Sequence, residues 1–210
     1  MILSDEQAAR AWIAARPDIN RDAIERLGAL AQMLEKENAR QNLVSAASLC
    51  SIWTRHFADS VQLLDHVPRG TGSWLDLGSG AGFPGLVIAI CDPGRDIRLI
   101  ESRARRITWL DGAIRALDLP HVLVEGQKVE TLGTFAASVI SARAFAPLKR
   151  LIALSERFST PETCWILPKG RSGRQELREM PLKLQRMFHV EQSITDPESV
   201  ILVGRGAVRP

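Results

Sequence analysis

The feature that most constrains the fold of this chain is a short apolar run that leads into a turn crowded with glycines. The run starts at Trp74, contains one carboxylate at Asp76, and continues into Gly78-Ser79-Gly80-Ala81-Gly82-Phe83-Pro84-Gly85. Glycine adopts positive φ angles and has no Cβ atom to keep a ligand away from the backbone. A strand that passes through such a turn into a helix predicts an α/β fold with a nucleotide-like ligand at the turn.

Two classes of ligand fit this pattern: dinucleotides and S-adenosylmethionine. Residues 80–85 satisfy the dinucleotide pattern G-x-G-x-x-G, and Glu101, after the next apolar run, would hold a ribose diol in either case. Asp76 favours S-adenosylmethionine, because its carboxylate would repel a pyrophosphate and attract the ammonium and sulfonium groups of a methyl donor. A glycine pattern alone is a weak signal, so the dinucleotide remains an alternative.

The N-terminal part of the chain is predicted to be helical. Ser4 starts a capping box for a first helix, Asn20 caps a second, and apolar residues at helical spacing from Trp53 mark a third. We therefore expect residues 1–70 to form a helical extension that packs on a core domain at 71–210.

From residue 73 onward, apolar runs alternate with helical segments. Strands are predicted at 73–77, 97–101, 122–125, 137–141, 163–167, 184–192 and 199–203, with helices from 84 and at 103–117, 147–158 and 172–179. Such alternation predicts a mostly parallel sheet with helices on both faces. The link between the last two runs is too short for a crossover helix, so these strands should pair antiparallel. Seven strands ending in a hairpin are typical of the Rossmann-like (class I) methyltransferase fold.

Charge and composition limit the partners. The chain of 210 residues has a net charge of +3, and its basic excess lies in the second half, beginning at Arg103. Ligands of open α/β sheets bind at the carboxyl ends of the strands, so a polyanion lying across that edge is expected. The apolar runs are too short to cross a bilayer, and the three cysteines form no C-x-x-C pair. We expect a cytoplasmic monomer that binds neither a membrane nor a metal.

Short polar clusters occur where a sheet of this type delivers its active-site loops. They are Asn42-Leu43-Val44-Ser45, Arg55-His56-Phe57-Ala58-Asp59-Ser60, Lys128-Val129-Glu130, Ser141-Ala142-Arg143-Ala144-Phe145-Ala146 and Leu167-Pro168-Lys169-Gly170. With the glycine turn and Glu101, their order resembles the bacterial RsmG family of 16S rRNA guanine-N7 methyltransferases, also called glucose-inhibited division protein B. The resemblance covers about residues 38–192, and the joint set is specific although each piece alone is weak.

The resemblance implies methylation of N7 of guanine 527, in the 530 loop of 16S rRNA, with S-adenosylmethionine as donor. Naked rRNA, the 30S subunit and an assembly intermediate are all possible substrates. The turn and the resemblance together give the predicted donor-binding residues Asp76, Gly78, Gly80, Gly82, Phe83, Glu101, Val129, Glu130 and Arg143. The resemblance also places Asn42, His56, Asp59, Arg143 and Lys169 around the reacting face.

The chemistry of the acceptor is consistent with this assignment. N7 of guanine has an in-plane lone pair, so its methylation removes no proton and needs no general base. We expect Asp59 to orient His56 in a polar clamp without an acid or base role, and Arg143 and Lys169 to contact phosphate or guanine O6. Phe145 is either a base-stacking residue or part of the core.

Three alternatives remain open at this stage. The methyl acceptor could be another RNA, a protein or a small molecule. The chain could be an NAD-dependent oxidoreductase, or a catalytically silent assembly factor that binds the donor. The basic second half of the chain, Asp76 and the terminal hairpin favour the rRNA methyltransferase.

Overall fold

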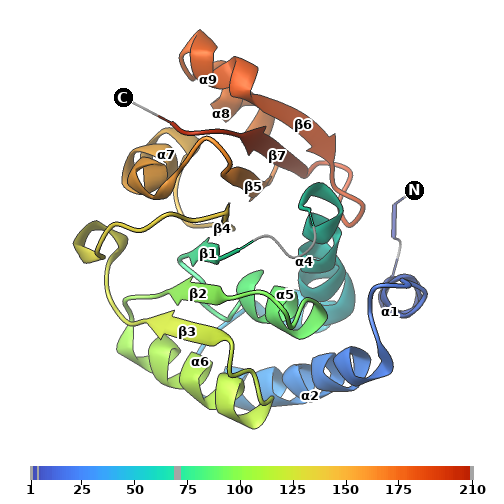
Figure 1. Ribbon diagram of the computed structural model, residues 1–210. Coiled ribbons are helices and arrows are strands. Elements are labelled where there is room, and N and C mark those ends of the chain that lie inside the picture. Colours follow the sequence, from blue (N-terminus) through green and yellow to red (C-terminus); the bar gives the residue numbers. More distant parts are fainter. Residues whose placement is uncertain (1, 4, 69–71, 209–210) are drawn as a thin grey trace.

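A seven-stranded sheet forms the centre of the molecule in a computed structural model that describes residues 2–3, 5–68 and 72–208. The strands are β1 (Trp74–Leu77), β2 (Ile97–Ile100), β3 (Val122–Glu125), β4 (Val139–Ala142), β5 (Cys164–Lys169), β6 (Phe188–Gln192) and β7 (Val200–Arg205). They lie in the order β3-β2-β1-β4-β5-β7-β6 (Figure 1). The first five are parallel, and β7 runs antiparallel to both β5 and β6. The predicted fold class, with its terminal antiparallel hairpin, is confirmed.

Helices cover both faces of the sheet. The α-helices are α1 (Glu6–Ala14), α2 (Arg21–Asn38), α3 (Ala46–Leu49), α4 (Asp59–Val61), α5 (Gly85–Cys91), α6 (Ala104–Ala116), α7 (Leu148–Ser155), α8 (Gly173–Arg178) and α9 (Leu182–Met187). Figure 1 shows α7 on the opposite face of the sheet from α1, α2, α4 and α5. Because side chains alternate along a strand, Trp74 belongs to the core under α2 and α5, and Leu75 belongs to the core under α7.

The N-terminal helices share one apolar core with the sheet. Leu27 and Leu30 of α2 are completely buried and belong to the same cluster as Ile88 of α5 and Leu99 of β2. The division into residues 1–70 and 71–210 stays a prediction. None of the described helices is long and apolar enough to cross a membrane.

Two details of the N-terminal helices were not predicted. The proposed cap Ser4 lies outside the described residues, and the N-cap of α1 is Asp5, whose carboxylate accepts a hydrogen bond from Ala8 N at 2.8 Å. The third predicted helix is irregular. It begins as a π-helix, η1 (Trp53–Ala58), continues through α4, and ends as a 3₁₀ helix, η2 (Gln62–His66).

The strand predicted at 184–192 is wrong in its first part. Residues Leu182–Met187 form α9, and β6 begins only at Phe188. Leucine, lysine, glutamine, arginine and methionine all favour helix, and Pro181 fixes the backbone at the helix start. Two shorter 3₁₀ helices, η3 (Val129–Thr131) and η4 (Glu156–Phe158), complete the described elements.

Candidate functional site

Two cavities open at the carboxyl ends of the parallel strands. The large cavity has a volume of about 1010 Å³ and extends from the glycine turn to the η1 helix and the turn between β6 and β7. The small cavity, of about 420 Å³, lies between the loops that follow β2 and β3. Gly78 and Phe145 line both cavities, so the glycine turn and the loop after β4 form their shared wall.

The glycine turn needs its glycines for two different reasons. Gly78, Gly80 and Gly82 have φ angles of +68°, +59° and +103°, which L-residues rarely adopt. A Cβ atom on Gly78 would collide with the ring of Phe145, at the wall between the cavities. A Cβ atom on Gly82 would collide with Leu86, and Gly82 lines neither cavity. The structure therefore gives Gly82 a role in the packing of the turn, and its predicted contact with the donor stays a prediction.

Asp76 does not reach the cavities. Its side chain is completely buried, and its Oδ1 accepts a hydrogen bond from Ser141 Oγ at 2.8 Å while its Oδ2 accepts one from Gly85 N at 3.2 Å. Burial raises the pKa of this carboxyl above its usual value. Asp76 lines neither cavity, and its predicted attraction of a cationic ligand stays a prediction. Its side chain joins β1, β4 and the start of α5.

The small cavity brings together four of the predicted donor-binding residues. Glu101 lines it beside Gly78, Val129 and Glu130. The Glu101 carboxylate accepts hydrogen bonds from Gly80 N at 3.1 Å, Ser102 N at 2.7 Å and Arg103 N at 2.9 Å. A carboxylate has about four acceptor positions, so capacity for a ribose hydroxyl remains.

Arg143 forms the centre of a polar clamp in the large cavity. Its Nη1 donates to Asp59 Oδ2 at 3.1 Å and to the carbonyl oxygen of Arg55 at 2.9 Å, and its Nη2 lies 2.9 Å from His56 Nδ1. The His56 ring stacks on Phe83 with centroids 4.6 Å apart, and the Arg143 guanidinium lies over the same Phe83 ring. Asp59 was expected to orient His56 directly. In the structure, Arg143 lies between them and bonds to both.

His56 is held in its neutral form. Burial, and secondly the charge of Arg143, lowers the pKa of His56 to about 3. Since Nδ1 accepts a hydrogen bond from Arg143, the ring proton is assigned to Nε2, which is buried and has no hydrogen-bond partner among the described residues. A group with this pKa is too weak a base to take a proton near neutral pH.

Two further residues were predicted at the reacting face, and only one of them lines the large cavity. Lys169 lines the large cavity, but its Nζ donates to Ala146 O at 3.0 Å and to Glu176 Oε2 at 2.9 Å, so its charge is already paired. Although burial opposes the shift, the bonds from Lys169 and Ser172 hold the pKa of Glu176 below its usual range. Asn42 is exposed and lines neither cavity, whereas the residues just after it line the large one. The segment after Asn42 therefore borders the cavity, and the role of Asn42 itself at the reacting face stays a prediction.

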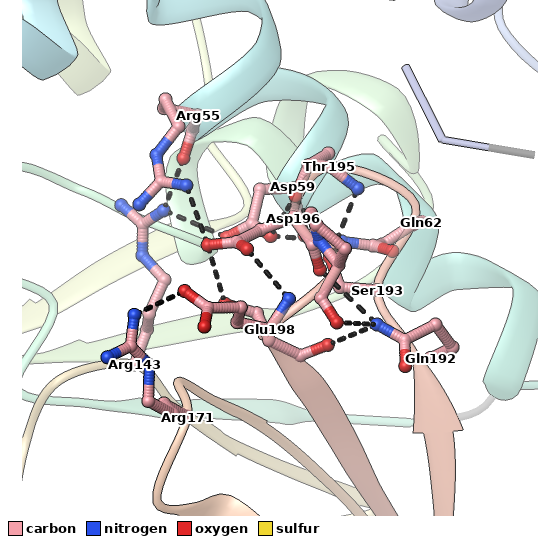
Figure 2. Close-up of polar contacts among 12 residues, drawn as sticks. Arg55, Asp59, Gln62, Arg143, Arg171, Gln192, Ser193, Thr195, Asp196 and Glu198 are labelled. Carbon is pink, nitrogen blue, oxygen red and sulfur yellow. Dashed lines mark hydrogen bonds and ion pairs between the residues drawn. The ribbon is translucent and has the colours of Figure 1, made fainter. Parts of the chain in front are cut away.

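The turn between β6 and β7, residues 193–199, was not among the predicted site segments. Ser193, Thr195 and Asp196 line the large cavity, and Asp196 Oδ2 accepts a hydrogen bond from Arg55 Nη1 at 3.0 Å (Figure 2). The signal was available in the predicted topology. Because β7 runs antiparallel to β5, Val200 pairs with Lys169, and the turn before it lies at the carboxyl edge of the sheet.

A family model described as rRNA small subunit methyltransferase G matches residues 23–199. The chain belongs to this family. The rRNA small subunit methyltransferase G of Erythrobacter litoralis is 55% identical over 100% of this chain and 100% of its own length. The protein of the same name from Novosphingobium aromaticivorans is 50% identical over 98% of this chain and 90% of its own length. The expected family membership is confirmed.

The fold is shared with more distant proteins. One example is the solved structure of a mutant of MtNAS in complex with S-adenosylmethionine, which matches with a TM-score of 0.56 and 15% sequence identity. The match covers 97% of the present chain and 84% of the MtNAS chain. Within the described residues, no group of three or more histidine, cysteine or acidic side chains is arranged to hold a metal ion.

Proposed function

We propose that this methyltransferase transfers the methyl group of S-adenosylmethionine to N7 of guanine 527, in the 530 loop of 16S rRNA. The observation that carries the proposal is the pair of cavities that share Gly78 and Phe145 in a chain of the rRNA small subunit methyltransferase G family. A nucleoside in the small cavity would present its reactive end to an acceptor in the large one.

The residues of the small cavity fit the donor. Its volume of about 420 Å³ lies within the usual range for small-molecule sites. Glu101 would accept a hydrogen bond from the ribose, and the buried side chain of Val129 would pack against the adenine. The Gly78 backbone would lie against the donor where the two cavities meet, because Gly78 lines both of them and its missing Cβ atom lets the Phe145 ring pack close beside it.

The large cavity suits an acceptor whose reacting atom has no proton to lose on methylation. When bound, S-adenosylmethionine supplies an electrophilic methyl group on a sulfonium sulfur, which the lone pair of N7 takes up as the carbon–sulfur bond breaks. His56 contributes no proton transfer, since its pKa is about 3. The Arg143 clamp instead fixes Phe83 and the cavity wall, so that orientation supplies most of the catalysis. Phe145, which lines both cavities, is placed to stack on the target base.

Mass spectrometry of 16S rRNA from cells that lack the protein tests the proposal. We expect one 7-methylguanosine to disappear and to return when the gene is restored. In a purified system, labelled methyl groups should appear on N7, where reduction followed by aniline cleaves the RNA. A methyl group on another RNA, a protein or a small molecule would refute the acceptor assignment. Absence of any transfer would instead favour a silent assembly factor.

The same purified assay distinguishes the possible substrates. Naked 16S rRNA, 30S subunits and assembly intermediates from cells lacking the protein are compared as acceptors. We further propose that the protein works in the cytoplasm, where these substrates are found, and that it acts as a monomer. Size-exclusion chromatography with light scattering tests the oligomeric state.

A further inference from the structure

The turn between β6 and β7 is fixed against the η1–α4–η2 helical segment by hydrogen bonds (Figure 2). Thr195 Oγ1 donates to Asp59 Oδ1 at 2.8 Å, and Ile194 N donates to Gln62 Oε1 at 2.9 Å. Gln62 Nε2 also donates to Ser193 Oγ at 3.2 Å. Ser193, Thr195 and Gln62 are buried, so these bonds are shielded from water. The backbone of the turn is therefore held in one position beside the large cavity.

Asp196 is the carboxylate that this turn directs toward Arg55. Its Oδ1 accepts a hydrogen bond from Glu198 N at 2.9 Å, and its Oδ2 accepts bonds from Ser199 Oγ and Arg55 Nη1, each at 3.0 Å. The Glu198 N–H, and after it Arg55, holds the pKa of Asp196 below its usual value. Asp196 is therefore ionised near neutral pH.

The Arg55 guanidinium has N–H donors at the cavity that no described residue accepts. Its side chain is 50% exposed, lines the large cavity, and makes one side-chain hydrogen bond among the described residues, the one to Asp196. A guanidinium carries five N–H donors in a planar fork. A group fixed at one end by a carboxylate, with its other donors in the solvent, is preorganised for a second anion.

We propose that Arg55 binds a backbone phosphate of the RNA strand that carries the target guanine, and that Asp196 is its positioning residue. The inference rests on the proposed rRNA methylation and deepens it. The side chains that line this cavity include five cations and three carboxylates, and Arg103 and Arg106 are not paired with any of these three. The excess of positive charge favours a polyanion over a neutral base edge as the partner of Arg55.

Removal of Arg55 tests the contact. Binding of RNA is measured at several salt concentrations, using 30S subunits that lack the methyl group and a labelled 16S rRNA fragment containing the 530 loop. For Arg55→Ala, we expect the dissociation constant to rise about tenfold and the salt slope to fall by about 0.7 to 0.9. Arg55→Lys should retain the slope but not the full affinity, because it keeps the charge and loses the fork.

The matched control is Arg21→Ala. Arg21 is exposed, pairs with Glu25 on α2, and lines neither cavity, but its loss changes the net charge by the same amount. We expect it to leave RNA binding unchanged. An equal effect of Arg21→Ala and Arg55→Ala would overturn the inference, as would a loss of affinity for Arg55→Ala with an unchanged salt slope, which indicates a base contact.

Asp196→Asn is a second test, because a positioning role and a pure net-charge effect predict opposite changes in RNA affinity. Removing a negative charge should strengthen RNA binding if only net charge matters. If Asp196 positions Arg55, the substitution should weaken binding by about threefold, and it should have no weakening effect in an Arg55→Ala background. The asparagine oxygen still accepts the Glu198 N–H bond that shapes the turn. Binding as tight as wild type, or tighter, would refute the positioning role.

The outcomes separate this inference from the proposed function. Affinity for S-adenosylmethionine, measured by calorimetry, and the thermal midpoint are expected to be unchanged in every variant. If wild type binds RNA and shows the Arg55 dependence but does not methylate N7, the proposed function fails and the phosphate contact stands. If wild type methylates N7 and Arg55→Ala binds RNA normally, the phosphate contact fails and the proposed function stands. If wild type binds neither RNA substrate, both fail.

Discussion

At the scale of single residues, hydrogen bonds within the protein determine which predicted site residues line a cavity. Glycines, acids and bases could be assigned to the right loops from the sequence, but not the direction in which each side chain points. The Asp76 carboxylate accepts hydrogen bonds from Ser141 and Gly85, and the Lys169 ammonium donates one to Glu176. Glu101 also binds backbone N–H groups, but it still lines a cavity. No local sequence pattern distinguishes these cases, because partners near in sequence, such as Glu176 for Lys169, and distant ones, such as Ser141 for Asp76, are selected only by the folded backbone.

His56 gives a prediction for stability against pH. Its folded-state pKa of about 3 lies below the unfolded value near 6.5, so the unfolded chain binds the proton first. The contribution of neutral His56 is fully present above about pH 6.5 and is lost as the pH falls from there toward 3. Between pH 7 and 5.5, urea unfolding of wild type should lose more free energy than that of His56→Gln, by up to about 1 kcal/mol. Parallel pH curves for the two proteins would contradict a buried neutral histidine.

At the scale of elements, strand alternation and the short final link were enough to predict the sheet. The family resemblance, and not the alternation, placed Asn42 to Ser45 and the segment around His56 near the site. The π-helix at Trp53–Ala58 had no such signal, because its irregular turn depends on tertiary contacts such as the bonds from Trp53 N and Thr54 N to the Glu6 carboxylate. Arg55 was overlooked for the same reason, since its partner Asp196 lies on the terminal hairpin.

The glycine turn predicts a graded response to added methyl groups. A Cβ atom on Gly80 would lie 3.3 Å from the flexible end of Arg106, whereas one on Gly82 would overlap Leu86 at the start of α5. Gly80→Ala should therefore cost about 1 kcal/mol of unfolding free energy, mainly from its positive φ. Gly82→Ala should cost about 2 to 4 kcal/mol, because strain and overpacking combine. Urea unfolding of both variants measures the difference, and equal losses would refute the separate roles.

Lys169 joins three elements, and its loss should affect the fold more than RNA binding. Its side chain is only 9% exposed, and its ammonium pairs with Glu176 of α8, which also accepts a hydrogen bond from Leu148 N at the start of α7. Lys169→Met leaves that carboxylate unpaired and should cost about 2 kcal/mol. Arg171→Ala is the control. Its pair with Glu198 is solvent-exposed, so its loss should change stability much less than the loss of Lys169 does in thermal or urea unfolding. A similar loss in both variants would show that burial of the Lys169 pair is unimportant.

At the scale of the whole molecule, the sheet edge determines which chemistry is available. The carboxyl ends of the parallel strands carry the glycine turn and the loop of Arg143, and the antiparallel β7 brings the turn of Asp196 to the same edge. The resulting large cavity contains several carboxylates, but Asp59 and Glu176 are paired with Arg143 and Lys169. Its histidine is neutral and weakly basic. The architecture therefore suits a transfer that requires orientation and no proton removal.

This architecture predicts how the rate of the proposed reaction depends on pH. Methylation of N7 releases no proton, so single-turnover transfer should be nearly constant from about pH 6 to 9. A histidine, cysteine or lysine acting as the general base would instead give a slope of one over part of that range. His56→Gln should lower the rate by disturbing the Arg143 clamp while leaving the profile flat, because the pKa of His56, about 3, lies below the measured range. Quenched-flow transfer of a labelled methyl group to 30S subunits gives both profiles. A wild-type profile that rises with a slope of one and becomes flat in His56→Gln would identify His56 as the base and overturn the base-free mechanism.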